Sequence, residues 1–204
     1  EEAARKENHR DPRTLIYLAR AYFDKAKMFE DANRKIYFDL SLNLFHEYLK
    51  GSGDFGNSSY RVMSGWAEER STAWSCVAEI AIVSGHPEVA VQAYESAMDE
   101  APEFPNHYID LAMAYTLMGN FAKAKHWLSV GANVPFPETT IITFPRYIKS
   151  RALEVSFQIN LHERKLEWAL QDAQKLLEIF PNDKLAQERI LTISSLKAYN
   201  TACQ

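Results

Sequence analysis

The residue types that commonly carry out catalysis do not fall into a catalytic spacing in this chain. His46 and Glu47 begin the H-E-x-x-H pattern of zinc peptidases, but position 50 is Lys50 rather than a second histidine. The six histidines are dispersed, and none stands at a metal-ligand spacing from a cysteine or a carboxylate. We therefore interpret His46 and Glu47 as part of a helix face and expect no metal site.

Other catalytic patterns are also missing from the sequence. It contains no G-x-x-x-x-G-K-[ST] or G-x-G-x-x-G phosphate-binding loop, and no serine lies in a G-x-S-x-G turn. Glu68 and Glu69 are adjacent carboxylates, but consecutive residues of a helix point in different directions. They fit the first turn of a helix better, because negative charge is stabilising there. We expect a chain that is not itself an enzyme and takes no cofactor.

The composition is typical of a helical protein with a sizeable core. Of the 204 residues, 47% are hydrophobic, and only 7 glycines and 8 prolines occur. The net charge of −4 argues against a nucleic-acid partner, and no apolar run is long enough to predict a membrane span. Cys76 and Cys203 predict free thiols in a reducing compartment, so we expect a cytoplasmic location. Because the chain does not begin with Met, we expect it to be a piece of a longer protein.

A period of 34 residues organises the middle of the chain. Gly85 and Gly119 are 34 residues apart, and the same distance separates Ala78 from Ala112. A fixed period of this size is the signature of a repeat architecture, in which each copy buries its apolar face against its neighbours.

Each copy of the period predicts two helices joined by a short turn. The clearest copies span 71–104, with helices over 72–84 and 88–100, and 105–138, where Gly119-Asn120 separates two amphipathic segments. Weaker copies lie at both ends, over 12–50 and over 150–183, and the turn of the last one is expected to be one residue longer.

Further segments stand outside the repeat pairs. In the first copy the helices are expected over 12–28 and 36–49, and the residues between them could lengthen the first helix or form a longer turn. Residues 51–65 predict a mobile insertion, and 135–150 could form an extended segment lying against the helices. A last helix, expected over 183–201, would cap the open end of the stack.

These spacings resemble the tetratricopeptide repeat (TPR) family. The first clear unit matches its pattern with Trp74, Val77, Ala78, Gly85, Ala90, Tyr94, Ala97 and Pro102. The second matches with Tyr108, Leu111, Ala112, Tyr115, Gly119, Phe121 and Ala124. The pattern is broken at Ala81, Pro87 and Gly131. The resemblance implies an all-α fold, a right-handed superhelix of antiparallel helix pairs with a C-terminal capping helix, in a single domain over 1–204.

The resemblance also implies a concave groove lined by the first helix of each unit. The positions that would face it are Arg13, Ile16, Arg20, Phe23, Thr72, Ser75, Glu79, Ile82, Asn106, Ile109, Met113 and Thr116. Such a groove would be basic at its N-terminal end and apolar further on. The positions that clamp a chaperone's terminal carboxylate in one TPR subgroup are here Ile16, Arg20, Cys76, Asn106 and Asp110. Because Asp110 would repel a carboxylate, we expect no chaperone-tail binding.

A narrower resemblance concerns the N-terminal half. Arg13, Tyr17, Leu18, Ala19 and Tyr22, followed by Gly65, Trp66, Glu68, Glu69 and Arg70, are similar to segments of the TPR region that follows the catalytic domain in bacterial and phage family 2 glycosyltransferases. Insertions over 27–36 and 51–64 depart from the compact form of that region. No D-x-D pattern occurs, so the resemblance implies family context without catalysis in this chain.

Three functional hypotheses follow. The first is a non-catalytic scaffold that binds a protein or peptide or mediates self-association, as part of a larger glycosyltransferase-like protein. The second is an accessory module that positions the acceptor or dimerises the enzyme, with Trp66 and the 51–65 segment as the candidate contact. The third is a stand-alone adaptor.

Overall fold

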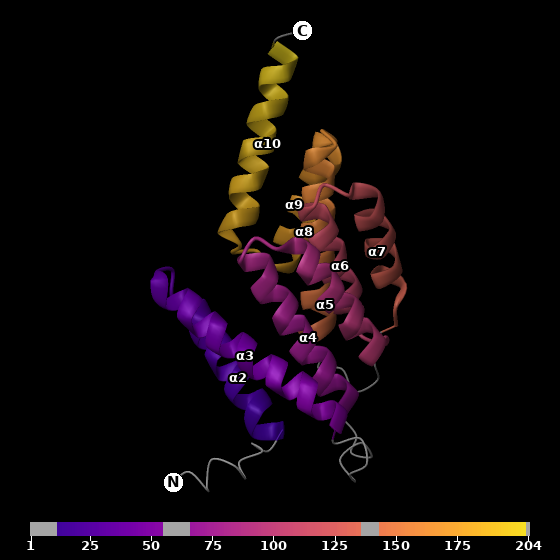
Figure 1. The fold of residues 1–204 in the computed structure, drawn as a ribbon. Coiled ribbons are helices and arrows are strands. Elements are labelled where there is room, and N and C mark those ends of the chain that lie inside the picture. The colour runs from indigo at the N-terminus through magenta and orange to yellow at the C-terminus, as the bar shows by residue number, and fades with distance from the viewer. Residues whose placement is uncertain (1–11, 55–65, 136–142, 203–204) are drawn as a thin grey trace, which may run out of the picture. The chain divides into compact units, whose positions relative to one another are not determined.

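A computed structural model describes residues 12–54, 66–135 and 143–202, and within these ranges every regular element is an α-helix. The chain divides into two compact units, Glu1–Ala101 and Pro102–Gln204. The prediction of an all-α repeat fold is confirmed, with consecutive helices running antiparallel in pairs (Figure 1).

The first unit contains two helix pairs. Their bounds are α2 (Pro12–Lys27), α3 (Ala32–Asp54), α4 (Trp66–Val83) and α5 (Pro87–Glu100). Helix α2 packs against α3, α4 packs against α5, and α4 also contacts both helices of the preceding pair. This is the stacking expected when neither hairpin can bury its apolar face alone.

The second unit contains two further pairs and a final helix. Their bounds are α6 (Pro105–Leu117), α7 (Phe121–Asn133), α8 (Thr143–His162), α9 (Leu166–Ile179) and α10 (Lys184–Ala202). Helix α8 packs against α9 and also contacts both α6 and α7. Helix α10 packs against α9, as the capping prediction requires.

Small side chains hold the paired helices close together. Ala78 and Ala112 in the first helices of two repeats, and Ala90 and Ala124 in the second helices, are completely buried. In the α2/α3 pair, Ala19 and Ser41 are the small residues at the contact. The Ser41 hydroxyl donates a 2.8 Å hydrogen bond to the Ala19 carbonyl. A larger side chain at any of these positions would force the helix axes apart.

One repeat brings its helices closer than even alanine permits. Gly131 stands where the repeat pattern has alanine, and a Cβ built there would lie 2.9 Å from the Tyr108 Cβ and 3.2 Å from the Pro105 carbonyl oxygen. Because neither atom is the end of a flexible side chain, the backbone itself sets this limit. The departure at Gly131 therefore marks a close contact between α7 and α6.

The three turns at 84–86, 118–120 and 163–165 share one hydrogen-bonding pattern. In each, a residue in the left-handed region donates its N–H three residues back and the next residue donates five residues back, at distances between 2.8 and 3.1 Å. This pair of hydrogen bonds is a Schellman motif, which gives the last carbonyl groups of a helix their hydrogen-bond partners. The left-handed residues are Gly85 (φ 80°), Gly119 (φ 71°) and Arg164 (φ 58°).

The turn of the last repeat is therefore not one residue longer, and that prediction is wrong. Helix α8 ends at His162 and α9 begins at Leu166, the same spacing as in the two clear repeats. The missing glycine hid the register, because Arg164 adopts the backbone conformation that glycine supplies in the other turns.

The second helix of the first pair was also predicted too short. It begins at Ala32 rather than 36, because the Asp31 carboxylate accepts a 2.9 Å hydrogen bond from the Asn33 N–H. It continues to Asp54, so 51–54 belong to the helix rather than to the expected insertion. Residues 55–65 lie outside the described ranges.

The expectation of an extended segment over 135–150 is wrong for its second half. Helix α8 already begins at Thr143, with Pro145 in its first turn, where the missing N–H leaves no helix carbonyl unpaired. Proline there suits the start of a helix, whereas the whole of 135–150 had been expected to be extended. Residues 136–142 lie outside the described ranges.

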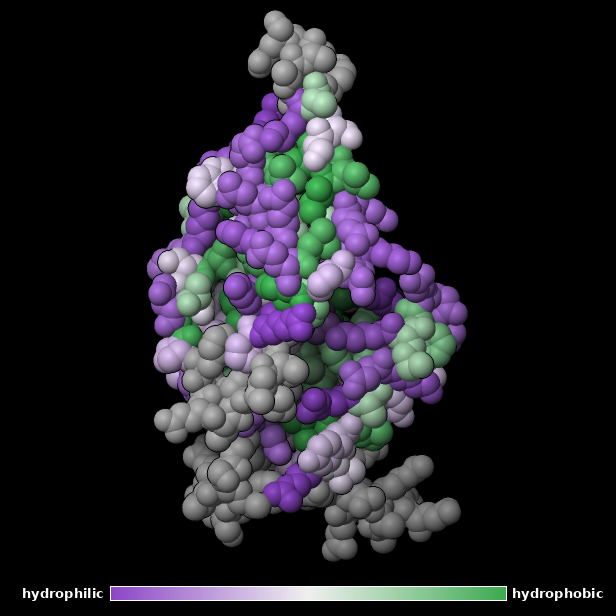
Figure 2. All heavy atoms as spheres, turned by 180° about the vertical axis from the view of Figure 1, so that it is seen from behind, coloured by the Kyte–Doolittle hydropathy of each residue, from purple (hydrophilic) through white to green (hydrophobic). Residues whose placement is uncertain are grey.

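Helix α10 is fixed by both apolar and charged contacts. Ile193 lies in a core cluster with Phe157 of α8 and Ala169 of α9. The Arg189 guanidinium pairs with both carboxylate oxygens of Glu154 and lies 4.6 Å from the Phe157 ring centroid. The rest of the helix is more open, with Leu185, Leu191 and Leu196 largely exposed. Figure 2 shows apolar side chains reaching the surface in the upper part of the view, where the C-terminal helices lie.

His107 is a buried titratable group in the second unit. Its side chain is 3% exposed, with the Phe104 ring 6.0 Å away between centroids. Its Nδ1 lies 3.1 Å from the Asn106 side-chain nitrogen. Burial lowers the pKa of His107 to about 4, because the imidazolium would lose its hydration.

We predict that Arg164→Gly raises the free energy of unfolding by about 0.5–1 kcal/mol, because glycine relieves the left-handed strain while adding entropy to the unfolded chain. Gly119→Ala should lower it by about 1 kcal/mol, since there an L side chain is introduced into the same conformation. Urea denaturation measures both. A destabilised Arg164→Gly variant would contradict the equivalence of the turns.

We predict that the folded chain loses stability as the pH falls below about 6.5. In the unfolded state His107 becomes protonated near that pH, whereas in the folded state it stays neutral until about pH 4. The stability that neutral His107 contributes is fully present above about pH 6.5, and about 2 kcal/mol of it is lost by pH 5. His107→Gln should flatten the stability profile between pH 6.5 and 5 in urea titrations. The matched control is His126→Gln at an exposed position of α7, which should keep the wild-type slope.

Candidate functional site: a cleft between α2 and α4

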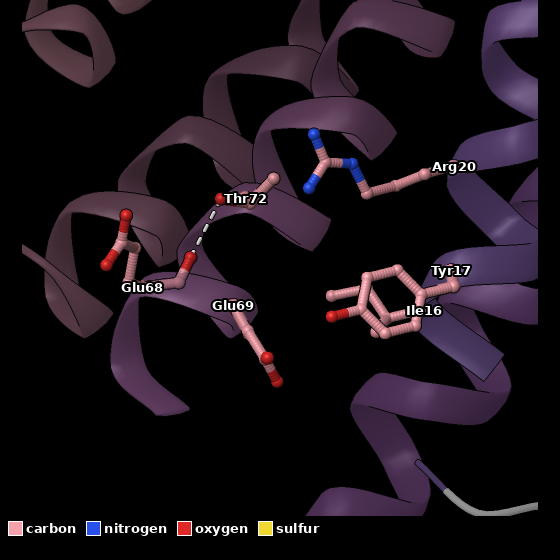
Figure 3. A pocket seen from close by; sticks show the side chains of 6 residues that line it. All are labelled: Ile16, Tyr17, Arg20, Glu68, Glu69 and Thr72. Carbon is pink, nitrogen blue, oxygen red and sulfur yellow. Dashed lines mark hydrogen bonds between the residues drawn. The ribbon is translucent and has the colours of Figure 1, made fainter. Parts of the chain in front are cut away.

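The first helices of the two repeats in the first unit enclose an open cleft of about 250 Å³. We call it the α2–α4 cleft. Its lining residues are Ile16, Tyr17, Arg20, Glu68, Glu69 and Thr72 (Figure 3). The volume lies below the usual range of small-molecule pockets, about 300–1,000 Å³. It therefore suits a few side chains of a larger ligand.

Helix α2 contributes an apolar floor and two exposed groups. Arg20 follows Ile16 by four residues and Tyr17 by three, so its side chain neighbours both, and all three point toward α4 (Figure 3). Ile16 is buried, whereas Tyr17 is 64% exposed. Arg20 is exposed, and its guanidinium makes no ion pair or hydrogen bond with any residue that the structure describes.

Helix α4 contributes two carboxylates from its first turn. Glu68 and Glu69 stand there as predicted, where the helix dipole favours negative charge. Their side chains diverge, and in Figure 3 the Glu69 carboxylate extends into the gap between the helices while Glu68 points elsewhere. The Glu68 carbonyl accepts hydrogen bonds from the hydroxyls of Ser71 (2.9 Å) and Thr72 (2.8 Å). Thr72 is thus held by its own helix.

Further along the same two helices, an ion pair joins them. The Lys27 ammonium lies 2.6 Å from the Glu79 carboxylate, and both side chains are 44% exposed. Cys76 is buried on the same side of α4. Burial, and after it the negative charge of Glu79, raises the pKa of Cys76 to about 12. The thiol therefore stays protonated and has little nucleophilic character.

The structure brings together three of the predicted groove residues, Ile16, Arg20 and Thr72, in the α2–α4 cleft. Of the others in the first unit, Phe23 is buried, with its ring 6.0 Å from that of Phe38 between centroids, and Glu79 pairs with Lys27. The remaining three do not line the cleft: Arg13 is exposed, and Ser75 and Ile82 are half-buried.

The groove prediction missed Tyr17, Glu68 and Glu69. The repeat positions used for that prediction do not include them. All three nevertheless lie in the two segments, 13–22 and 65–70, to which the sequence had drawn attention for reasons other than the repeat positions.

In the second unit the predicted groove residues do not line one common cleft. Met113 and Thr116 line another cleft, of about 300 Å³, with Leu117, Gly119, Phe121, Gln158 and His162. Ile109 is only 1% exposed, and its side chain lies against Gly131, so it belongs to the core. Asn106 is half-buried next to His107. A third and larger cleft, of about 540 Å³, lies between α3 and the end of α4, and no predicted groove residue lines it.

The positions of a carboxylate clamp supply only part of its chemistry. Arg20 is exposed and positively charged, but Ile16 and Cys76 are buried and carry no positive charge. Asp110 accepts a 2.7 Å hydrogen bond from the Arg151 guanidinium, so its charge is largely balanced within the second unit. The expected repulsion by Asp110 is therefore smaller than the sequence alone indicates, and the missing cations argue more strongly against a clamp.

In the described ranges, no group of three or more histidine, cysteine or acidic side chains is arranged to hold a metal ion. None of the described helices combines the length and apolar character needed to cross a membrane.

Comparison with solved structures defines the class of fold. The structure is similar to the first TPR domain of Spaghetti (RPAP3), solved with the HSP90 peptide SRMEEVD bound, at a TM-score of 0.52 and 22% sequence identity over 63% of this chain and 95% of that one. A thermophilic TPR protein from Thermus thermophilus matches at a TM-score of 0.48 and 23% identity, over 94% of this chain and 86% of that one. No family model and no curated protein matches the chain.

The first of these likenesses shows that the chain has the TPR fold. This agrees with the repeat positions found in the sequence and with the three equivalent turns. It concerns the arrangement of the helices, and function has to be argued from the site.

We predict that Cys76 is almost unreactive in the folded chain. With a pKa of about 12 against an ordinary 9.0, its thiolate fraction at pH 8 is about a thousandfold lower than in the unfolded chain. In a Cys203→Ser variant, the thiol reagent DTNB should react at least about a hundredfold more slowly without denaturant than with it. Equal rates would show that α2 and α4 separate readily.

Proposed function

We propose that this chain is a non-catalytic scaffold that binds an extended segment of a partner protein in the α2–α4 cleft. The observation that carries the proposal is the Arg20 guanidinium, which faces this cleft without an ion pair or hydrogen bond to the described residues. A charged group left open beside an exposed tyrosine is typical of a recognition surface, where arginine and tyrosine are enriched.

The shape and chemistry of the cleft support binding over catalysis. The described residues that line it form no pair of nucleophile and base, since their polar groups are arginine, glutamate, tyrosine and threonine, with the threonine hydroxyl bonded to its own helix. The likeness to a TPR domain that was solved with a peptide supports a protein or peptide as partner. We place this activity in the cytoplasm, and we include self-association among the ways in which the scaffold acts.

We propose, as a second candidate, that the chain is an accessory module of a larger glycosyltransferase-like protein. The observation that favours it is that Tyr17, Glu68 and Glu69, from two segments similar to the TPR region of such enzymes, line one cleft. Arg70 of the same stretch has a structural role, since its guanidinium lies 2.6 Å from the Glu100 carboxylate. In this role the module positions the acceptor or dimerises the enzyme.

Light scattering of the chain over a range of concentrations tests the second candidate. A stable dimer would support the dimerising role. A monomer whose addition leaves acceptor use by such an enzyme unchanged would contradict both forms of it.

We predict that peptides selected from a random displayed library on the whole chain bind the α2–α4 cleft. Tyr17→Ala should weaken a selected synthetic peptide about five- to thirtyfold in fluorescence anisotropy, because it removes about 1–2 kcal/mol of contact. Tyr147→Ala, at an exposed tyrosine of α8, is the matched control and should leave affinity unchanged. The proposal fails if no peptide is selected, or if both variants bind as the wild type does.

A further inference from the structure

The α2–α4 cleft presents opposite charges from its two walls. Arg20 extends from α2, and Glu69 extends from α4 (Figure 3). Within the described ranges, neither side chain takes part in an ion pair or a side-chain hydrogen bond. The cleft therefore offers a donor of two parallel hydrogen bonds and an acceptor, both open to a ligand.

The two groups stay apart although the same helices pair their charges elsewhere. Lys27 of α2 and Glu79 of α4 meet at 2.6 Å. In Figure 3 the Arg20 guanidinium lies level with Thr72, while the Glu69 carboxylate lies at the opposite end of the cleft. Thr72 follows Glu69 by three residues, which is about one helical turn, so the two charged groups lie at different ends of the cleft.

Two charged groups at different ends of one cleft suit an extended peptide. In an extended chain, residues two apart point to the same side and are spaced by about 6.6–7 Å, so their side chains can meet two such groups at once. A helical ligand would instead present neighbouring side chains three or four residues apart.

We propose that the α2–α4 cleft recognises an extended peptide segment with an acidic and a basic residue two positions apart. Arg20 binds the acidic side chain, Glu69 binds the basic one, and Tyr17 packs against the backbone between them. This inference rests on the proposed function and adds the charge pattern of the partner.

Charge argues against the other polymers that an arginine could bind. A nucleic acid would bring phosphates close to Glu68 and Glu69, with Arg20 as the one cation among the described residues that line the cleft. A purely acidic peptide meets the same repulsion, and a purely basic one meets Arg20. A segment of mixed charge satisfies both walls.

The test uses four labelled heptapeptides with the central sequences Glu-Ser-Lys, Lys-Ser-Glu, Glu-Ser-Glu and Lys-Ser-Lys in otherwise identical flanks. Fluorescence anisotropy against the whole chain should show at least one mixed-charge peptide binding about three- to tenfold tighter than both like-charge peptides. The preference should shrink as salt is raised from about 50 to about 500 mM. Equal binding of all four would overturn the inference.

Charge-reversal variants make the test independent of a general loss of binding. Arg20→Glu should shift the preference to Lys-Ser-Lys, and Glu69→Lys should shift it to Glu-Ser-Glu, each by a similar factor. The matched controls are Lys35→Glu and Glu95→Lys, exposed charges of α3 and α5, which should keep the mixed-charge preference. Circular dichroism confirms that each variant is folded.

The outcomes separate this inference from the proposed function. If library peptides bind at Tyr17 but the reversal variants do not change charge preference, the inference fails and the scaffold remains. If no peptide of any pattern binds and library selection also fails, the proposed function fails as well.

Discussion

The close approach of paired helices is the constraint on which the rest of this structure depends. Ala78 and Ala90, and their equivalents one repeat later, have no exposed surface, so each hairpin is as thin as its backbones allow. Only hairpins of this thickness can stack with their first helices adjacent, as α2 and α4 do. The α2–α4 cleft exists because two such helices lie side by side, while their larger side chains fill the layers on either side.

Polar contacts then fix the relative positions of helices that apolar packing alone leaves adjustable. Arg189 and Glu154 hold α10 to α8, and Asp172 accepts hydrogen bonds from Ser156 (2.7 Å) and Asn160 (2.8 Å) across the α8/α9 pair. Because a buried carboxylate without such donors would be costly, Asp172 selects the arrangement of α8 and α9 that supplies them. Against this background, charges without a partner in the α2–α4 cleft stand out.

The fold could be predicted from the sequence where a local signal carries it. Gly85 and Gly119 reveal two turns because their backbone conformation disfavours other residues. Arg164 hides the third turn because it adopts the same left-handed conformation although it is not glycine. The start of α3 was missed because it depends on one side-chain cap at Asp31. The start of α8 was missed because 135–150 had been expected to be extended, although Pro145 is compatible with the first turn of a helix.

The cleft was less predictable than the fold. Repeat positions predict which helix face points toward a groove, and three of the predicted residues, Ile16, Arg20 and Thr72, line the α2–α4 cleft. They do not specify how deeply a side chain is buried, and so Ile109 and Phe23 were included although both belong to the core. Nor do they specify which charges find partners, since pairs such as Asp110 and Arg151 join residues far apart in the sequence.

Gly131 gives the third hairpin a property that its neighbours lack. At the equivalent position of the preceding repeat stands Ala97, a fully buried residue whose methyl group is accommodated between the helices. A single methyl group at 131 would act as a wedge between α7 and α6. One carbon atom can therefore change the thickness of a repeat. A change in thickness also changes the spacing at which the next repeat stacks.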